Sequence, residues 1–159
     1  MVSLSRLVAA VLVGSAAGAA AATGDALLYT SNRGDGPEIY SARADGSEAK
    51  QLTKSPGGNE QPRWSPDGSR IAYVSYRDRN PEIYVIEADG SNPKRLTDHP
   101  LEDADPRWSP DGKRLAFVSS RTGRPQVFVM NADGSGLRQL AETPGEQGSP
   151  QWSPDGAKI

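Results

Sequence analysis

The hexapeptide RWSPDG occupies residues 63–68 and recurs at residues 107–112, and QWSPDG follows at residues 151–156. Each copy contains one of the 3 tryptophans of the chain, 44 residues from the next: Trp64, Trp108 and Trp152. A fixed spacing with no insertion or deletion is typical of an architecture that repeats one supersecondary unit.

The same period extends through most of the chain. Matching segments begin at Leu27, Ile71 and Leu115, which divides the sequence into repeats 27–70, 71–114 and 115–158. Within a repeat, the β-branched and aromatic runs indicate short strands, and no segment has a sustained helical stripe of apolar residues. In the middle of the chain these runs are IAYVSY, EIYVIE, KRLT and QPRW.

Two kinds of turn connect the predicted strands. In Ser-Pro-Asp-Gly, Pro66 presets φ and Gly68 takes the last position, which is the type I pattern. Asp89-Gly90 favours a two-residue hairpin of type I′. Four antiparallel strands in a unit of this length form one blade of a β-propeller. The sequence therefore predicts an all-β fold, an incomplete β-propeller of about three four-stranded blades of 44 residues.

The recurring tryptophan has a predicted structural role. An indole buries up to about 250 Å², so one tryptophan per repeat can be wedged between neighbouring blades. We expect the residues of this motif to be structural: Trp64, Pro66, Asp67, Gly68, Trp108, Pro110, Asp111, Gly112, Trp152, Pro154, Asp155 and Gly156.

The N-terminus differs in kind from the repeats. Arg6 precedes an uncharged apolar run that ends in small residues, which is the pattern of a secretory signal peptide. A membrane anchor is the alternative, but an anchor needs a longer and more strongly apolar run than this one. We predict a signal peptide over residues 1–22, a propeller fragment over residues 23–159, and a periplasmic or secreted location without a membrane span after cleavage.

Composition excludes several classes of function. The formal net charge of −2 is not that of a nucleic-acid-binding protein. The absence of cysteine excludes disulfides, thiolate metal sites and cysteine catalysis. No cofactor is expected.

The segments PRWSPDGKRLAFVSSR and QVFVMNADGSGLRQLA, with their counterparts, resemble the repeats of TolB-like propellers, also called PD40 or WD40-like repeats. The resemblance covers residues 27–159. It implies an exported, largely periplasmic propeller that binds other proteins, although the N-terminal α/β domain of the family's namesake is missing. Similar repeats form the propellers of some serine peptidases and of some polysaccharide-processing enzymes.

Three repeats are fewer than the 4 to 8 blades of a typical propeller. We therefore expect either a truncated chain or a ring that is completed by self-association.

The constant Ser-Pro-Asp-Gly and Ala-Asp-Gly turns are predicted to lie on one rim, and the connections that vary in charge on the other. Varied polar loops on a rigid scaffold favour recognition of partners. The predicted partner-binding residues lie near the start of the innermost strands: Asn59, Glu60, Asp103, Asp105 and Gln147.

The acidic stretch DHPLEDAD at residues 98–105 could bind Ca²⁺, but its spacing fits no EF-hand and favours a solvated loop. His99, the 1 histidine, would have to serve any Ser-His-Asp triad, and no G-x-S-x-G motif accompanies it. We predict no catalytic and no metal site.

The predicted function is that of an exported, non-catalytic propeller that mediates protein–protein interaction. Two alternatives remain. The chain could be the gating propeller of an exported serine peptidase whose catalytic domain is absent, or a carbohydrate-binding or polysaccharide-processing propeller.

Overall fold

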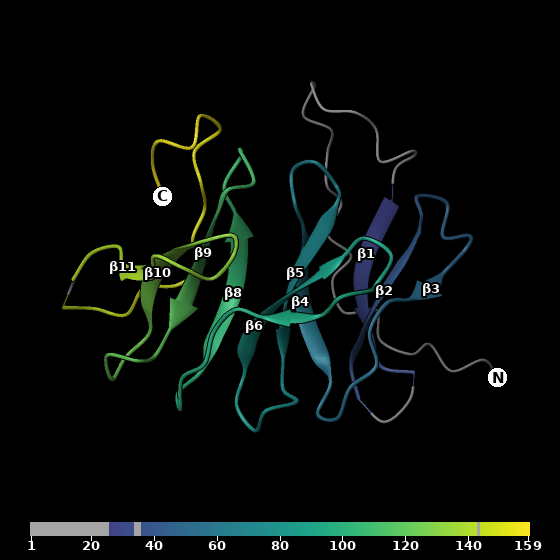
Figure 1. The fold of residues 1–159 in the computed structure, drawn as a ribbon, viewed down its shortest axis with the longest axis horizontal. Helices are drawn as coiled ribbons and strands as arrows, with labels where there is room; N and C mark the ends of the chain where they lie inside the picture. Colours follow the sequence, from purple (N-terminus) through teal and green to yellow (C-terminus); the bar gives the residue numbers. More distant parts are fainter. Residues whose placement is uncertain (1–25, 34–35, 143) are drawn as a thin grey trace.

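The computed structural model describes residues 26–33, 36–142 and 144–159, and within them it confirms the predicted all-β fold of propeller blades. Three antiparallel sheets lie side by side (Figure 1). None of the described segments forms a helix that could span a bilayer. The predicted signal peptide, residues 1–22, lies outside the described residues.

Each sheet corresponds to one blade. The first blade has three strands, β1 (Ala26–Ser31), β2 (Glu38–Arg43) and β3 (Lys50–Gln51). The second blade has four: β4 (Asn59–Trp64), β5 (Arg70–Ser75), β6 (Glu82–Glu87) and β7 (Lys94–Arg95). The third blade repeats this order as β8 (Asp103–Trp108), β9 (Arg114–Ser119), β10 (Gln126–Asn131) and β11 (Arg138–Gln139).

The blades are offset from the sequence repeats. β4 belongs to the first repeat by sequence, but it pairs with β5 of the second repeat, with Trp64 opposite Ile71. β8 likewise pairs with β9 of the third repeat. Each four-stranded blade therefore takes its first strand from the preceding repeat, which ties consecutive repeats together through backbone hydrogen bonds.

The hydrophobic core consists of two clusters, each shared by neighbouring blades. Leu28 and Ile39 of the first blade pack with Ile71, Tyr73 and Ile86 of the second. The other cluster joins the second and third blades: Val74, Ile83, Val85, Trp108, Leu115, Phe117, Phe128 and Met130 are among its members. Strands buried on both faces explain why β5 and β6 are apolar almost throughout.

The indole of Trp108 lies between the second and third blades. It is 8% exposed and belongs to the shared core cluster. Its Nε1 donates a hydrogen bond of 3.1 Å to the carbonyl oxygen of Arg63, and the guanidinium of Arg70 lies 4.9 Å from the ring centroid. Both partners belong to the second blade, so one side chain contacts the preceding blade by packing, hydrogen bonding and a cation–π contact.

Trp152 repeats this arrangement against the third blade. Its Nε1 donates to the carbonyl oxygen of Arg107 at 3.0 Å, and Arg114 lies 4.6 Å from its ring. Trp64 packs partly against the first core cluster, but its Nε1 has no hydrogen-bond partner among the described residues.

The constant turns also dock onto neighbouring blades. Arg70 Nη2 donates to the carbonyl oxygen of Gly112 at 3.5 Å, between two Ser-Pro-Asp-Gly turns. Lys50 Nζ donates to Asp89 O at 2.8 Å, and Lys94 Nζ donates to Asp133 O at 2.9 Å, so the second and third Asp-Gly turns each contact the blade before them. We call the edge that carries these turns the turn rim. Blade-to-blade contact explains why its sequence is constant.

Gly90 gives a test of this docking. Its φ is +92°, and a Cβ there would lie 2.6 Å from Leu52 O of the first blade, whereas Gly46 has φ +81° and open space around it. A left-handed conformation alone costs about 1 kcal/mol for alanine, and overpacking adds about 1–3 kcal/mol. We expect Gly90→Ala to lower the free energy of unfolding, measured by urea denaturation, by about 2–3 kcal/mol and Gly46→Ala by about 1 kcal/mol. Equal losses would contradict the docking.

The aspartates of the constant turns should make the stability of the fold depend on pH in the acid range. A hydrogen bond from the Ser65 hydroxyl, with further bonds from Ser69, lowers the pKa of Asp67 to about 2. Serine hydrogen bonds also lower the pKa values of its counterparts: Asp45, Asp89, Asp111, Asp133 and Asp155. A folded-state pKa below the unfolded value of about 3.9 stabilises the fold above that value, and this stabilisation is lost as the pH falls towards about 2.

The urea concentration at the midpoint of unfolding should therefore decrease as the pH is lowered from about 5 to about 2. The decrease should be less steep in Asp67→Asn. Glu102→Gln is the matched control, because Glu102 is exposed and forms no ion pair among the described residues. An unchanged slope in Asp67→Asn would refute the assignment.

Candidate functional site

The second edge of the blades, which we call the loop rim, carries the connections of variable sequence. Strand order places there the starts of β4 and β6 and the ends of β5 and β7, with their counterparts in the other blades. Two loops per blade meet on this rim, and their backbones are joined in the same way each time. Asn59 N, Asp103 N and Gln147 N donate to the carbonyl oxygens of Pro37, Pro81 and Pro125, respectively, at 2.6, 2.9 and 2.8 Å.

Asn59 and Asp103, two of the predicted site residues, are completely buried beneath these loops. Asn59 Nδ2 donates to Glu38 Oε2 and to Ser55 Oγ, both at 2.7 Å. Asp103 instead accepts two hydrogen bonds from Arg121 Nη2, at 2.9 and 3.2 Å. Partner binding by the five predicted residues stays a prediction. Because Asn59 and Asp103 are buried, their contribution to it would be to position the loops.

The change from Asn59 in the second blade to Asp103 in the third is accompanied by a change at a second buried position. Arg77 Nη2 in the second blade donates to the hydroxyl of Tyr73 at 3.2 Å. The third blade has Phe117 at the position of Tyr73 and therefore no hydroxyl there. Its arginine, Arg121, bonds to Asp103 instead. The acidic residue thus occurs in the blade whose arginine has no competing acceptor.

The arginines that recur after each central hairpin strand have a common support. Their Nε atoms donate to the serine hydroxyl two residues earlier, at 3.1 Å in Arg33, 2.9 Å in Arg77 and 2.8 Å in Arg121. Each guanidinium also lies over an aromatic ring of its own blade. The shared contacts orient these cations, and the remaining Nη atoms differ in what they bind.

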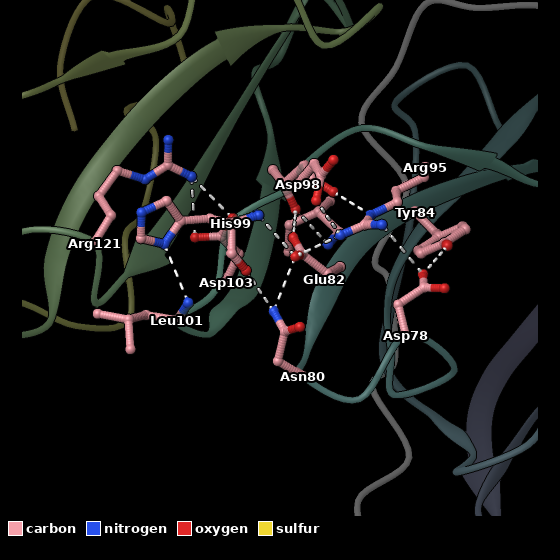
Figure 2. Close-up of polar contacts among 12 residues, drawn as sticks. Asp78, Asn80, Glu82, Tyr84, Arg95, Asp98, His99, Leu101, Asp103 and Arg121 are labelled. Atoms are coloured by element: carbon pink, nitrogen blue, oxygen red, sulfur yellow. Dashed lines mark hydrogen bonds and ion pairs between the residues drawn. The ribbon is translucent and has the colours of Figure 1, made fainter.

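The densest polar cluster of the loop rim surrounds Glu82 in the second blade (Figure 2). The carboxylate of Glu82 is completely buried and accepts hydrogen bonds from Thr97 Oγ1 at 2.5 Å, His99 N at 2.9 Å and Asn80 Nδ2 at 2.9 Å. Arg95 Nη2 bonds to Glu82 at 2.8 Å.

Arg95 connects this cluster to carboxylates in both loops of the second blade. Its Nη2 also bonds to Asp98 at 2.7 Å, and its Nη1 lies 3.7 Å from Asp78. Asp78 accepts a hydrogen bond from the hydroxyl of Tyr84, and burial together with this bond raises the pKa of Tyr84 to about 12. We call the contacts of Arg95 with Glu82, Asp98 and Asp78 the Arg95 bridge. It closes the corner between the two loops of the second blade.

Sequence reasoning missed the buried glutamates. In the first blade, Glu38 accepts from Thr53 Oγ1 at 2.6 Å and from Ser55 N at 2.8 Å, as Glu82 does from Thr97 and His99. The signal was a pair of positions that change together, because the third repeat has Gln126 in place of the glutamate and Ala141 in place of the threonine.

The other predicted site residues are partly exposed. Glu60 accepts a hydrogen bond of 3.2 Å from the Tyr76 hydroxyl. Asp105 is paired with Arg107 at 2.8 Å, and its backbone N donates to Gln61 Oε1 at 2.6 Å. Gln147 Oε1 accepts from Val127 N at 2.8 Å. The structure therefore distributes the five predicted residues along the starts of successive innermost strands rather than in one cleft.

The acidic residues at 98–105 do not converge. Asp98 faces Arg95, while Asp103 faces Arg121, and burial raises the pKa of Asp103 against the opposing effects of Ser119 and Arg121. Within the described ranges, no three His, Cys, Asp or Glu side chains are grouped so that they could hold a metal ion. His99 Nδ1 accepts a hydrogen bond of 3.1 Å from Leu101 N, which holds the ring within its own loop.

Antiparallel four-stranded blades joined through shared cores define the class of this protein as a β-propeller. A profile of the TolB β-propeller domain, PD40, matches residues 19–159, and the chain belongs to this family. No curated protein matches the chain in a sequence search.

Solved structures agree with this family. A protein assigned as TolB from Agrobacterium tumefaciens is 33% identical with a TM-score of 0.74, over 82% of this chain and 51% of that one. TolB from Acinetobacter baumannii is 28% identical with a TM-score of 0.70, over 82% of this chain and 33% of that one. The chain thus spans about half and about one third of these relatives. The tricorn protease, at 17% identity and a TM-score of 0.58 over 80% of this chain and 12% of its own, shares the fold alone.

Proposed function

We propose that this chain is an exported, non-catalytic propeller that binds other proteins through its loop rim. The observation that carries the proposal is the contrast between the two rims. Contacts between blades account for the constant sequence of the turn rim, as in the bond from Lys50 to Asp89. Within the part of the chain that the structure describes, no contact between blades requires the exposed residues of the loop rim to differ in charge from blade to blade.

The exposed side chains of the loop rim support recognition of a protein. Leu101 is 45% exposed at the tip of the second blade, and the acidic side chains of Asp98 and Glu102 flank it. Beneath this tip, Glu82 accepts a hydrogen bond from His99 N, and Asp103 N donates to the carbonyl oxygen of Pro81, so the loop backbone is held at two points. An apolar side chain with a polar surround on a rigid support is the usual composition of an interface.

A photo-crosslinking amino acid tests this surface in the full chain expressed in a Gram-negative host. Placed at Leu101, it should yield crosslinked protein adducts, because this side chain projects from the loop rim. Placed at Lys113, which is also exposed but directly follows a Ser-Pro-Asp-Gly turn, it should yield none. Adducts from both positions, or from neither, would refute the proposal. The same cells test export, since the periplasmic chain should begin near Thr23.

A second copy of the chain is one candidate partner. β1 has a strand partner only on its β2 side among the described residues, and an unpaired sheet edge favours pairing with another chain. Light scattering during size exclusion should then give twice the mass of the mature chain, which is 16.9 kDa less the mass of the signal peptide. A monomer at all concentrations would exclude self-association and leave other proteins as the partners.

A further inference from the structure

A pocket of about 710 Å³ opens on the loop rim of the first blade. Its lining includes Arg33, Glu38, Tyr40, Gln51, Lys54 and Ser55. Pockets that hold small ligands measure about 300–1,000 Å³, so this one is large enough for a side chain of a partner.

The second blade shows why the first has a pocket. There, the Arg95 bridge spans the same corner and joins Glu82 to Asp98. In the first blade, Gln51 stands at the position of Arg95 and Lys54 at that of Asp98. Gln51 keeps one contact of its counterpart, a hydrogen bond of 2.8 Å to Thr53 O, but it is too short to reach across. The corner therefore stays open.

The charges of the pocket are not paired within it. Arg33 and Lys54 have no acidic partner within 4.0 Å among the described residues, where seven other ion pairs occur. The carboxylate of Glu38 lies at the base, 8% exposed, and accepts from Thr53, Ser55 N and Asn59. Those three donors already satisfy Glu38, so among the described lining residues two exposed cations outnumber one buried anion.

The donors of the pocket are positioned for an anion. Arg33 is oriented by its Nε bond to Ser31 and by the ring of Tyr40, 5.0 Å away, and neither of its Nη atoms has a partner among the described residues. Ser55 Oγ accepts from Asn59, which leaves the hydroxyl proton of Ser55 to donate. A guanidinium with two parallel donors matches the geometry of a carboxylate.

We propose that this pocket binds a side-chain carboxylate in an acidic segment of a partner protein. The inference rests on the proposed protein-binding function and specifies the chemistry of its partner. Arg33 would bind the carboxylate through its Nη atoms, Lys54 would supply the second positive charge, and Ser55 would donate a third hydrogen bond.

The test is an NMR titration of the full ¹⁵N-labelled chain with the capped peptide Ac-Gly-Glu-Gly-Glu-Gly-NH₂, following the amides of Gln51 and Ser55. We expect saturable shifts, with a dissociation constant about tenfold lower for this peptide than for its counterpart with Gln in place of Glu. Added salt should weaken the binding, because the cations are exposed. Lys54→Gln should weaken binding about fivefold. Gln51→Arg combined with Lys54→Asp should abolish it, because these changes restore the counterparts of Arg95 and Asp98 beside Glu38.

Arg124→Gln is the matched control, since it removes one exposed cation from the same rim in the third blade, and it should leave binding within about twofold. Equal binding of the two peptides, or an equal loss in Arg124→Gln, would overturn the pocket assignment. Equally strong shifts with inorganic phosphate would show a general anion site and would also overturn it. Crosslinking from Leu101 is independent of this pocket, so a failure here with adducts there refutes only the pocket.

Discussion

Replacing Trp108 with alanine is expected to lower the free energy of unfolding by about 3–5 kcal/mol, the range for large aromatic truncations in cores. The indole is almost completely buried between two blades, and its loss would leave a cavity there. The carbonyl oxygen of Arg63 would also lose its donor. Urea denaturation followed by circular dichroism measures the change.

Two variants separate the causes of this loss. Trp108→Phe keeps much of the buried volume but removes the hydrogen bond, so it should cost about 1–2 kcal/mol. Trp152→Ala removes the same kinds of contact from a side chain that is only partly buried, and it should cost less than Trp108→Ala. A Trp108→Ala protein as stable as the parent would disprove the role of the tryptophan as an inter-blade wedge.

Replacing Glu82 with alanine is expected to lower the free energy of unfolding by about 1–3 kcal/mol for each buried donor that loses its acceptor. Arg95 would lose its bond at 2.8 Å, and Thr97 and the backbone of His99 would lose their acceptor. The loops of the second blade should loosen as well, which faster amide hydrogen exchange at His99 and Leu101 would report.

The third blade supplies the control for Glu82. It has Gln126, Gln139 and Ala141 at the positions of Glu82, Arg95 and Thr97. The triple variant Glu82→Gln, Arg95→Gln, Thr97→Ala should therefore cost less than about 1.5 kcal/mol, because no buried charge is left unpaired. A triple variant that is less stable than Glu82→Ala would show that the network is not the cause.

The fold could be predicted because its determinants are local and repeated. The Pro-Asp-Gly turns specify hairpins, and runs such as residues 71–76 specify strands, so three copies leave little ambiguity. The predicted type I′ turn at Asp89-Gly90 was wrong, because only Gly90 has a positive φ and Glu87 N bonds to Ser91 O around a three-residue loop. The position of the blades relative to the repeats was harder to predict. Which strand β4 pairs with depends on contacts between repeats, which no single repeat contains.

The candidate site was predicted less completely. The loop rim follows from the strand order, but the burial of Asn59 and Asp103 does not, because polar residues at strand starts are usually assumed to face water. Glu82 was overlooked for the same reason, since a glutamate in sequence gives no sign that threonine and backbone donors surround it. Comparing repeats position by position finds these networks, because partners such as Glu38 and Thr53 change together.

The offset of the blades from the repeats also bears on how such proteins evolve. Since β4 completes a sheet that begins in the next repeat, and β8 does the same, both described junctions between consecutive units have the same strand pairing. Duplicating or deleting one 44-residue segment of the gene would recreate a native junction wherever the cut falls. Relatives should therefore differ in length by whole multiples of this unit more readily than by short insertions within a strand.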